Sequence, residues 1–109
     1  MAKIYQPSHE ATELTLYANN DYNIYQVIQL VVTNLAKKYA KGVFVREKAI
    51  QAFYNVANQA AKSYCLRFGS WSDKYYTMFS VSDRYTCASD LLDNYIDEIM
   101  EESKHYAKH

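Results

Sequence analysis

Glycine, proline and cysteine are scarce in this sequence, and it contains no long run of apolar residues. The 109 residues include two Gly, one Pro and two Cys. Glycine at positions 42 and 69 alone cannot form a glycine-rich phosphate-binding loop. Two cysteines, Cys65 and Cys87, are too few for a disulfide framework or a four-cysteine zinc site, so we expect reduced thiols. The most apolar stretch, 24–35, is too short and too interrupted for the roughly 20 residues of a membrane-spanning helix.

The residues that are present indicate one folded domain. Half of them are apolar, and twelve are tyrosine. A chain of this length can bury one core but not two, which predicts a single helical domain over residues 1–109. Few glycines and prolines are typical of a folded protein with little turn structure. The first residues do not form a secretory signal, so we expect a cytoplasmic protein that does not contact a membrane.

Apolar residues recur every three or four positions in four segments, which is the period of an α-helix. The first helix is predicted to begin at a Ser8 cap and to bury Ala11, Leu14 and Ala18. The later apolar stripes are Ile24, Ile28, Val31, Leu35 and Tyr39, then Ile50, Phe53, Ala57, Ala60, Tyr64 and Phe68, and finally Tyr85, Ala88, Leu92, Tyr95 and Ile99. The sequence therefore predicts an all-α fold, a small bundle of about four helices with short connections.

The ends of the second helix can be located from its polar residues. Asp21 follows two asparagines and is predicted to cap the helix that begins there. Lys37, Lys38 and Lys41 fall in the last turn, where positive charge meets the negative end of the helix dipole. Gly42 follows as the expected left-handed terminator. The lysines therefore have a structural reason to be at this corner.

The last helix is predicted to start after a short segment that is rich in serine and aromatic residues. Ser80, together with Ser82 or Asp83, has the spacing of a helix cap. Trp71 and Phe79 lie just before this point and are expected to fill the end of the core.

Charge is separated along the chain although the net charge is zero. Residues 1–36 contain one basic and three acidic residues. Residues 37–67 contain seven basic residues and one acidic residue, and residues 68–109 contain four basic and eight acidic residues. The basic middle and the acidic end either attract each other within the fold or face different partners. The outer face of the last helix is predicted to carry an acidic row, which consists of Asp90, Asp93, Asp97 and Glu101.

The residues needed for catalysis are poorly placed. His9 is beside a helix start, and His105 and His109 are close to the chain end, so none is expected beside a nucleophile. Glu101, His105 and His109 have zinc-binding spacing if the last helix continues to the end, but a frayed terminus is the favoured interpretation. We predict no catalytic residue, no cofactor and no metal site.

A binding surface for a protein partner is the first functional prediction. Tyrosine is enriched at protein interfaces, and several tyrosines fall outside the apolar stripes. The residues predicted to bind a partner are Phe44, Tyr54, Tyr75, Tyr76 and the acidic row. Contact between two copies of the chain is another use that this surplus of tyrosine allows.

Binding of nucleic acid by the basic segment 37–48 and the polar side of the third helix is the alternative. The candidate residues are Lys37, Lys38, Lys41, Arg46, Lys48, Gln51 and Asn55. Basic side chains bind phosphate, and Asn and Gln can pair with adenine. A DNA-binding helix-turn-helix, however, needs small or apolar residues where Lys38 and Lys48 stand relative to Gly42. A near-neutral sequence pI of 6.8 also weakens attraction to phosphate.

Short matches spread over most of the chain give a resemblance to a known group. They are Tyr5-Gln6-Pro7-Ser8, Glu13-Leu14, Leu16-Tyr17, Asn20-Asp21, Tyr25, Asn34-Leu35, Lys37-Lys38, Ala40-Lys41-Gly42, Glu47-Lys48-Ala49, Ala61-Lys62, Tyr64, Phe79, Arg84 and Ala88. The chain resembles small, functionally uncharacterised proteins of tailed bacteriophages. The resemblance implies a phage protein in the host bacterial cytoplasm and brings no known active site. It makes a host protein the expected partner, for example a defence component such as a CRISPR nuclease.

One position departs from the pattern of that group. Val45 stands where an aspartate would be expected to cap the third helix, and Val43 and Phe44 precede it. Loss of a helix cap costs about 1 kcal/mol. We therefore expect the Val-Phe-Val run either to pack against the core or to form an exposed apolar contact site.

Overall fold

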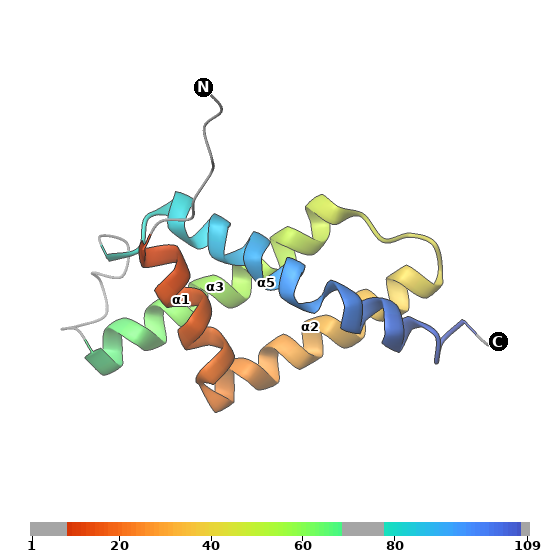
Figure 1. The fold of residues 1–109 in the computed structure, drawn as a ribbon, viewed down its shortest axis with the longest axis horizontal. Helices are drawn as coiled ribbons and strands as arrows, with labels where there is room; N and C mark the ends of the chain where they lie inside the picture. Colours follow the sequence, from red (N-terminus) through yellow and green to blue (C-terminus); the bar gives the residue numbers. More distant parts are fainter. Residues whose placement is uncertain (1–8, 69–77, 108–109) are drawn as a thin grey trace, which may run out of the picture.

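The computed structural model describes residues 9–68 and 78–107, and these residues form helices and turns without a strand (Figure 1). The helices are α1 (His9–Asn20), α2 (Tyr22–Ala40), α3 (Arg46–Phe68) and α5 (Val81–Ser103). Asp21 alone joins α1 to α2, and residues 41–45 join α2 to α3. The predicted all-α bundle is confirmed, and the two connections that are fully described, α1–α2 and α2–α3, are short. The predicted cap Ser8 and Trp71 lie outside the described residues.

Helices α3 and α5 cross each other and make the most extensive contact between any two of the described helices (Figure 1). Phe53, near the start of α3, stacks on Tyr95 in the middle of α5, with ring centroids 6.3 Å apart. At the other end of this contact, Tyr64 meets Phe79 edge to face at 5.2 Å. Phe79 is buried, as predicted for a residue that closes the end of the core.

Helices α1 and α2 complete the bundle by packing on this crossed pair. In Figure 1, α2 forms the lower edge, and α3 lies behind α1 and α5. The Thr33 hydroxyl on α2 donates a hydrogen bond to Glu102 near the end of α5, at 3.2 Å. The Tyr95 hydroxyl on α5 donates to the side-chain oxygen of Asn19 on α1, at 2.6 Å. Each of these helices is therefore tied to α5.

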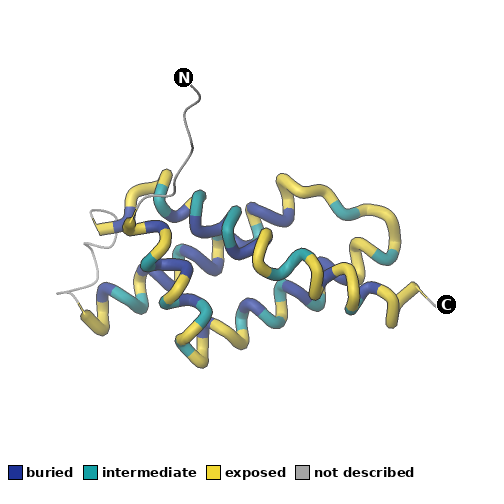
Figure 2. The backbone as a smooth tube through the Cα atoms, in the orientation of Figure 1, coloured by how far each residue is buried: buried dark blue, intermediate teal, exposed yellow. Residues whose placement is uncertain are grey.

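The core lies along the inward faces of all four helices (Figure 2). Four alanines of α3 are fully buried, which lets the neighbouring helices approach its backbone closely. They are Ala49, Ala57, Ala60 and Ala61. Larger side chains from the other helices fill the remaining volume, and they are Leu14, Ile28, Val32, Leu91, Leu92 and Ile99.

The predicted apolar stripes are partly wrong at their edges. Tyr39, Phe68 and Tyr85 are exposed rather than buried. Tyr39 and Phe68 lie in the last turns of their helices, where fewer neighbours cover them. On α5 the buried face includes Arg84 instead of Tyr85. A spacing of three or four residues does not decide which of two adjacent positions faces the neighbouring helix.

Two helix starts have the caps that the sequence predicts. The Asp21 carboxylate accepts a hydrogen bond from the Ile24 backbone N–H at 3.0 Å. At the start of α5, the Ser80 side chain accepts from the Asp83 N–H, and the Asp83 carboxylate accepts from the Ser80 N–H, each at 3.0 Å. This reciprocal pair is a capping box, so both predicted caps are confirmed.

At the corner between α2 and α3, α2 ends in a defined motif, whereas the residue before α3 has no side chain that can cap it. Gly42 adopts the left-handed conformation, with φ of 73°. Its N–H donates to the Tyr39 carbonyl, and the Val43 N–H donates to the Lys38 carbonyl, which is the Schellman pattern. Val45 precedes α3, and its carbonyl accepts from the Ala49 N–H. A valine side chain has no group that could accept a hydrogen bond from the first N–H groups of α3.

We expect Asp21→Ala to lower the free energy of unfolding by about 1–2 kcal/mol at neutral pH, because the α2 cap is lost. The Ile24 N–H lowers the pKa of Asp21, with further hydrogen bonds and Arg67 acting in the same direction. Its stabilising effect is therefore complete above the ordinary pKa of about 3.9 and is lost as the pH falls through the lower native value. Urea denaturation followed by circular dichroism between about pH 2 and 7 measures the free energy of unfolding of both proteins.

The matched control is Asp21→Asn, since this variant retains a good cap without a titrating charge. It should keep most of the stability at neutral pH and lose the part of the acid dependence that Asp21 contributes. An acid dependence equal to that of the unmodified protein would contradict the assignment to Asp21.

Candidate functional site

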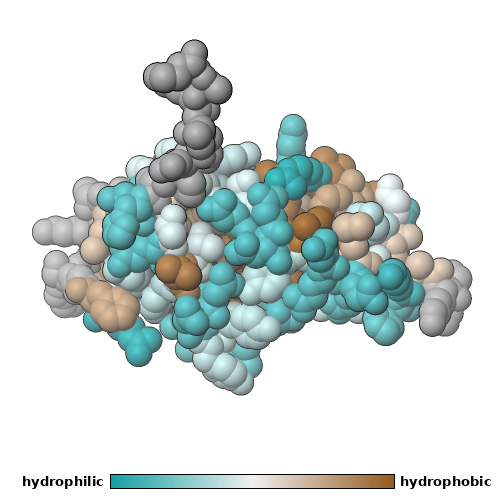
Figure 3. Space-filling model, viewed as in Figure 1, coloured by the Kyte–Doolittle hydropathy of each residue, from teal (hydrophilic) through white to brown (hydrophobic). Residues whose placement is uncertain are grey.

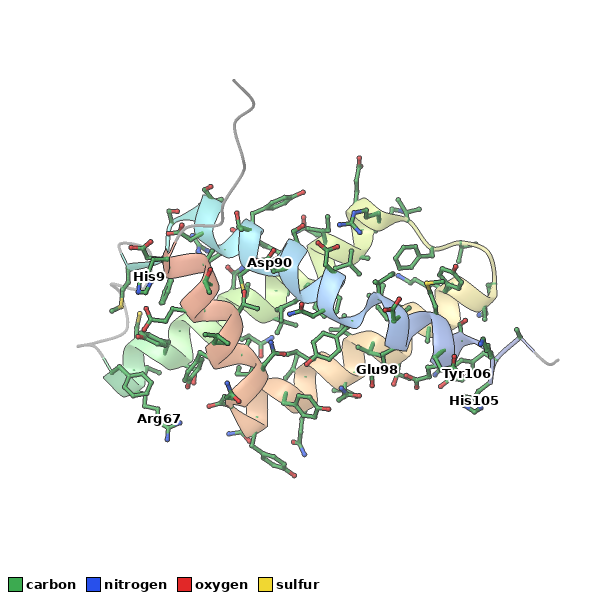
Figure 4. The ribbon with its side chains drawn as sticks, in the orientation of Figure 1. His9, Arg67, Asp90, Glu98, His105 and Tyr106 are labelled. Atoms are coloured by element: carbon green, nitrogen blue, oxygen red, sulfur yellow. The ribbon has the colours of Figure 1, made fainter. Side chains whose placement is uncertain are left out.

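Reactive side chains are dispersed in the described part of the chain. His9 and His105 lie at opposite ends of the molecule (Figure 4). Cys65 and Cys87 are buried and free, and burial raises the pKa of Cys87 to about 11. Within residues 9–68 and 78–107, no group of three His, Cys, Asp or Glu side chains is placed to hold a metal ion. The candidate functional features of the described residues are therefore surface patches.

The aromatic residues predicted to bind a partner are less exposed than expected. Phe44 is half-buried, and its ring lies 5.6 Å from that of Tyr39. Tyr54 is also half-buried and packs 6.2 Å from Tyr85. The other two predicted residues, Tyr75 and Tyr76, lie outside the described residues. Phe44 and Tyr54 therefore offer only part of their surface to a partner, and their role in binding stays a prediction.

The Val-Phe-Val run at residues 43–45 is predicted either to pack against the core or to be exposed, and it does both. Phe44 packs against the core, whereas Val43 and Val45 are exposed. In Figure 3, a hydrophobic area covers this corner between α2 and α3 on an otherwise largely hydrophilic face. The corner is thus a small apolar patch rather than a continuous binding surface.

The acidic row lies on α5, and its members differ in exposure. Asp93, Asp97 and Glu101 are exposed, whereas Asp90 is half-buried. Burial raises the pKa of Asp90, and the neighbouring Asp93 adds to the effect. Asp93 accepts a hydrogen bond from Arg46 on α3, with 2.8 Å between nitrogen and oxygen. Because both partners are more than half exposed, this ion pair contributes at most about 1 kcal/mol.

The basic residues of the nucleic-acid alternative share one corner but differ in their surroundings. Those exposed to solvent are Lys37, Lys38, Lys41, Lys48, Gln51 and Asn55. Arg46 is engaged by Asp93, and the Lys37 ammonium lies 5.6 Å from the centre of the Tyr106 ring. A phosphate group that approaches this corner therefore also meets carboxylates of α5, which weakens its attraction.

A larger surface, which the sequence pattern did not predict, lies along α2. Tyr22 and Leu30 are 72% and 66% exposed, and Tyr25 is exposed beside them. With Gln26 and Gln29 they line a shallow hollow of about 500 Å³. These five residues are spaced so that they fall on one side of the helix. We call them the α2 face.

The α2 face is also distinctive because it lacks charge. No Asp, Glu, Lys or Arg occurs between Tyr22 and Ala36, although α2 is exposed along one side. The polar groups are amides and phenols, and Gln26 donates a hydrogen bond to the Tyr22 hydroxyl at 2.8 Å. The Gln29 amide nitrogen is buried and has no hydrogen-bond acceptor among the described residues. This uncharged stretch is the sequence signal that could have found the face, but by itself it does not show which side of the helix stays exposed.

Comparison with known proteins adds no relative. No protein-family model matches the chain, and no match is found among curated proteins or among solved structures. In the part of the chain that the structure describes, no helix combines the length and the apolar character needed to cross a bilayer. The function is therefore inferred from the geometry and chemistry of this chain.

Proposed function

We propose that this protein is a non-enzymatic binding module that docks a partner protein on the α2 face. The observation that carries the proposal is an exposed helix side with two tyrosines and a leucine and no charged residue. The water-facing side of a surface helix normally carries charged residues. The centres of protein interfaces are instead depleted in charge and enriched in tyrosine.

The α2 face has the chemistry that a docking surface needs. Burial of Leu30 and of the tyrosine rings favours association by about 25 cal/mol for each Å² of apolar surface removed from water. Tyrosine loses little conformational entropy for its large contact area. The phenol and amide groups supply hydrogen bonds without the cost of desolvating a charge.

The partner expected from the resemblance to phage proteins is a host protein. Binding would then block that host protein. We propose a defence component, for example a CRISPR nuclease, as the target. The exposed carboxylates of Asp97 and Glu101 on α5 would favour a partner with a basic surface nearby.

A pair of leucine variants tests the α2 face. A tagged protein would first be used to capture a partner from host lysate, and the purified partner would then be titrated by calorimetry. We expect Leu30→Asp to weaken binding at least about tenfold, because a carboxylate must be desolvated in the interface. Leu66→Asp is the matched control, since Leu66 is 57% exposed on α3. Its affinity should stay within about twofold of the unmodified protein.

Three results would contradict the proposal. One is partner binding that Leu30→Asp leaves unchanged. Another is a homodimer that Leu30→Asp dissociates, since the face would then belong to a second copy. The third is that the protein retards duplex DNA in gel electrophoresis at about 150 mM salt, and that this retardation is lost when Lys37, Lys38 and Lys41 are all replaced by alanine. This result would favour the nucleic-acid alternative.

A further inference from the structure

A second surface feature is a pocket between α1 and the end of α3. It has a volume of about 340 Å³ and lies at the end of the molecule where Figure 4 labels His9 and Arg67. Its lining residues are Glu13, Leu16, Tyr17 and Asn20 from α1 and Tyr64 and Phe68 from α3. Neither the acidic row nor the α2 face includes any of these residues.

Three aromatic rings form one wall of the pocket. Tyr17 meets Tyr64 at 5.3 Å and Phe68 at 6.1 Å, with interplanar angles of 82° and 84°. Tyr64 and Phe68 are 5.0 Å apart at 53°. All three residues line the pocket, so a ligand inside it can contact their rings. The faces of aromatic rings carry partial negative charge and attract cations.

A carboxylate at the rim adds a full negative charge to this wall. The Tyr64 hydroxyl donates a hydrogen bond to Oε1 of Glu13 at 2.6 Å, which raises the pKa of Tyr64. The other oxygen, Oε2, lies 3.6 Å from the exposed imidazole of His9. The hydrogen bond holds the carboxylate beside the rings, and Oε2 is left able to accept a further hydrogen bond from a ligand.

Among the described residues that line the pocket, Glu13 carries the charge. Asp21 follows α1 directly, and Arg67 precedes the pocket residue Phe68 on α3. Arg67 lies 3.8 Å from a carboxylate oxygen of Asp21. Its guanidinium is 5.7 Å from the centre of the Phe68 ring, so this aromatic group already accepts one guanidinium of the chain itself.

We infer that this pocket binds an arginine side chain presented by a partner protein. The guanidinium would lie against the rings of Tyr17 and Tyr64 and donate to Oε2 of Glu13. The methylene groups of the arginine would contact Leu16, which is exposed at the pocket edge. Arginine fits better than lysine because its planar head stacks on aromatic rings and pairs with carboxylates.

The inference deepens the proposed function, since it rests on a protein partner and names a residue type that the partner presents. Asn20 in the pocket and Tyr22 in the α2 face are separated by one residue. One partner can therefore contact both surfaces across the α1–α2 junction.

Titration with a small arginine derivative tests the pocket without the partner. N-acetyl-arginine amide would be added to the ¹⁵N-labelled protein, with the citrulline and lysine amides as comparison ligands. A single side chain is expected to bind in about the millimolar range and to shift the amide signals of Leu16, Tyr64 and Phe68. Citrulline has almost the same shape without the charge, and we expect it to bind at least about tenfold more weakly.

Two glutamate variants on α1 provide the matched control. Glu13→Gln keeps an acceptor for Tyr64 but removes the charge, and we expect about a tenfold loss of affinity for the arginine amide. Glu10→Gln makes the same charge change at an exposed residue outside the pocket lining, and its affinity should change less than about twofold.

Several results would overturn the inference. They are the absence of shifts at saturating millimolar concentrations, equal binding of the citrulline or lysine amide, and equal losses in the two glutamate variants. These results would leave the α2 face untouched, because that proposal is measured with the partner and the Leu30→Asp variant. Conversely, failure of the leucine test would not alter the measured affinity of the pocket for arginine amide.

Discussion

Phe53→Ala is expected to lower the free energy of unfolding by about 3–5 kcal/mol. Phe53 is completely buried in the contact between α3 and α5, where it stacks on Tyr95. Removal of the ring loses its burial from water and leaves a cavity. The surrounding helices can close the cavity only in part, because each is held by contacts with the others.

Urea denaturation followed by circular dichroism measures this loss. A domain of this size has a total stability of about 5–15 kcal/mol, so the variant should unfold at a much lower urea concentration. Leu66→Ala is the control on the same helix, because Leu66 is exposed. A change within about 0.5 kcal/mol is expected for it. Equal losses for the two variants would contradict the assignment of Phe53 to the core.

Ala57→Leu is the second substitution with a large expected effect. Ala57 is fully buried on the alanine-rich side of α3. The larger leucine side chain at this position must displace a neighbouring helix or force strained side-chain rotamers, which costs about 1–3 kcal/mol. The melting temperature should fall by at least about 4 °C.

A leucine at an exposed position of the same helix controls for the added apolar surface. Gln59 is exposed on α3, and Gln59→Leu should change stability by no more than about 0.5 kcal/mol. An unchanged melting temperature for Ala57→Leu would show that the helices beside α3 leave more space than the structure describes.

The features that could be predicted from the sequence are those settled by nearby residues. The cap at Asp21 and the capping box of Ser80 and Asp83 satisfy backbone groups only three residues away. Gly42 ends α2 because its own backbone conformation is left-handed. Such features depend on local chemistry, so a single sequence is enough to place them.

The features that could not be predicted depend on residues far apart in the chain. Arg84 is buried because its guanidinium reaches the Asn58 side-chain oxygen on α3 at 2.8 Å. Glu13 becomes part of a pocket only because the fold brings Tyr64 to it. The apolar spacing of α2 is compatible with burial of either side, and the packing of α5 and α3 decides which side stays exposed.

The uncharged stretch from Tyr22 to Ala36 has a consequence for how a complex would respond to ionic strength. A contact made by uncharged groups is hardly screened by dissolved ions, and salts that are excluded from apolar surfaces strengthen it. An arginine held by Glu13 would instead be released more readily as salt rises. At low salt a partner would therefore be bound by both surfaces. At high salt the α2 face would contribute most of the binding free energy.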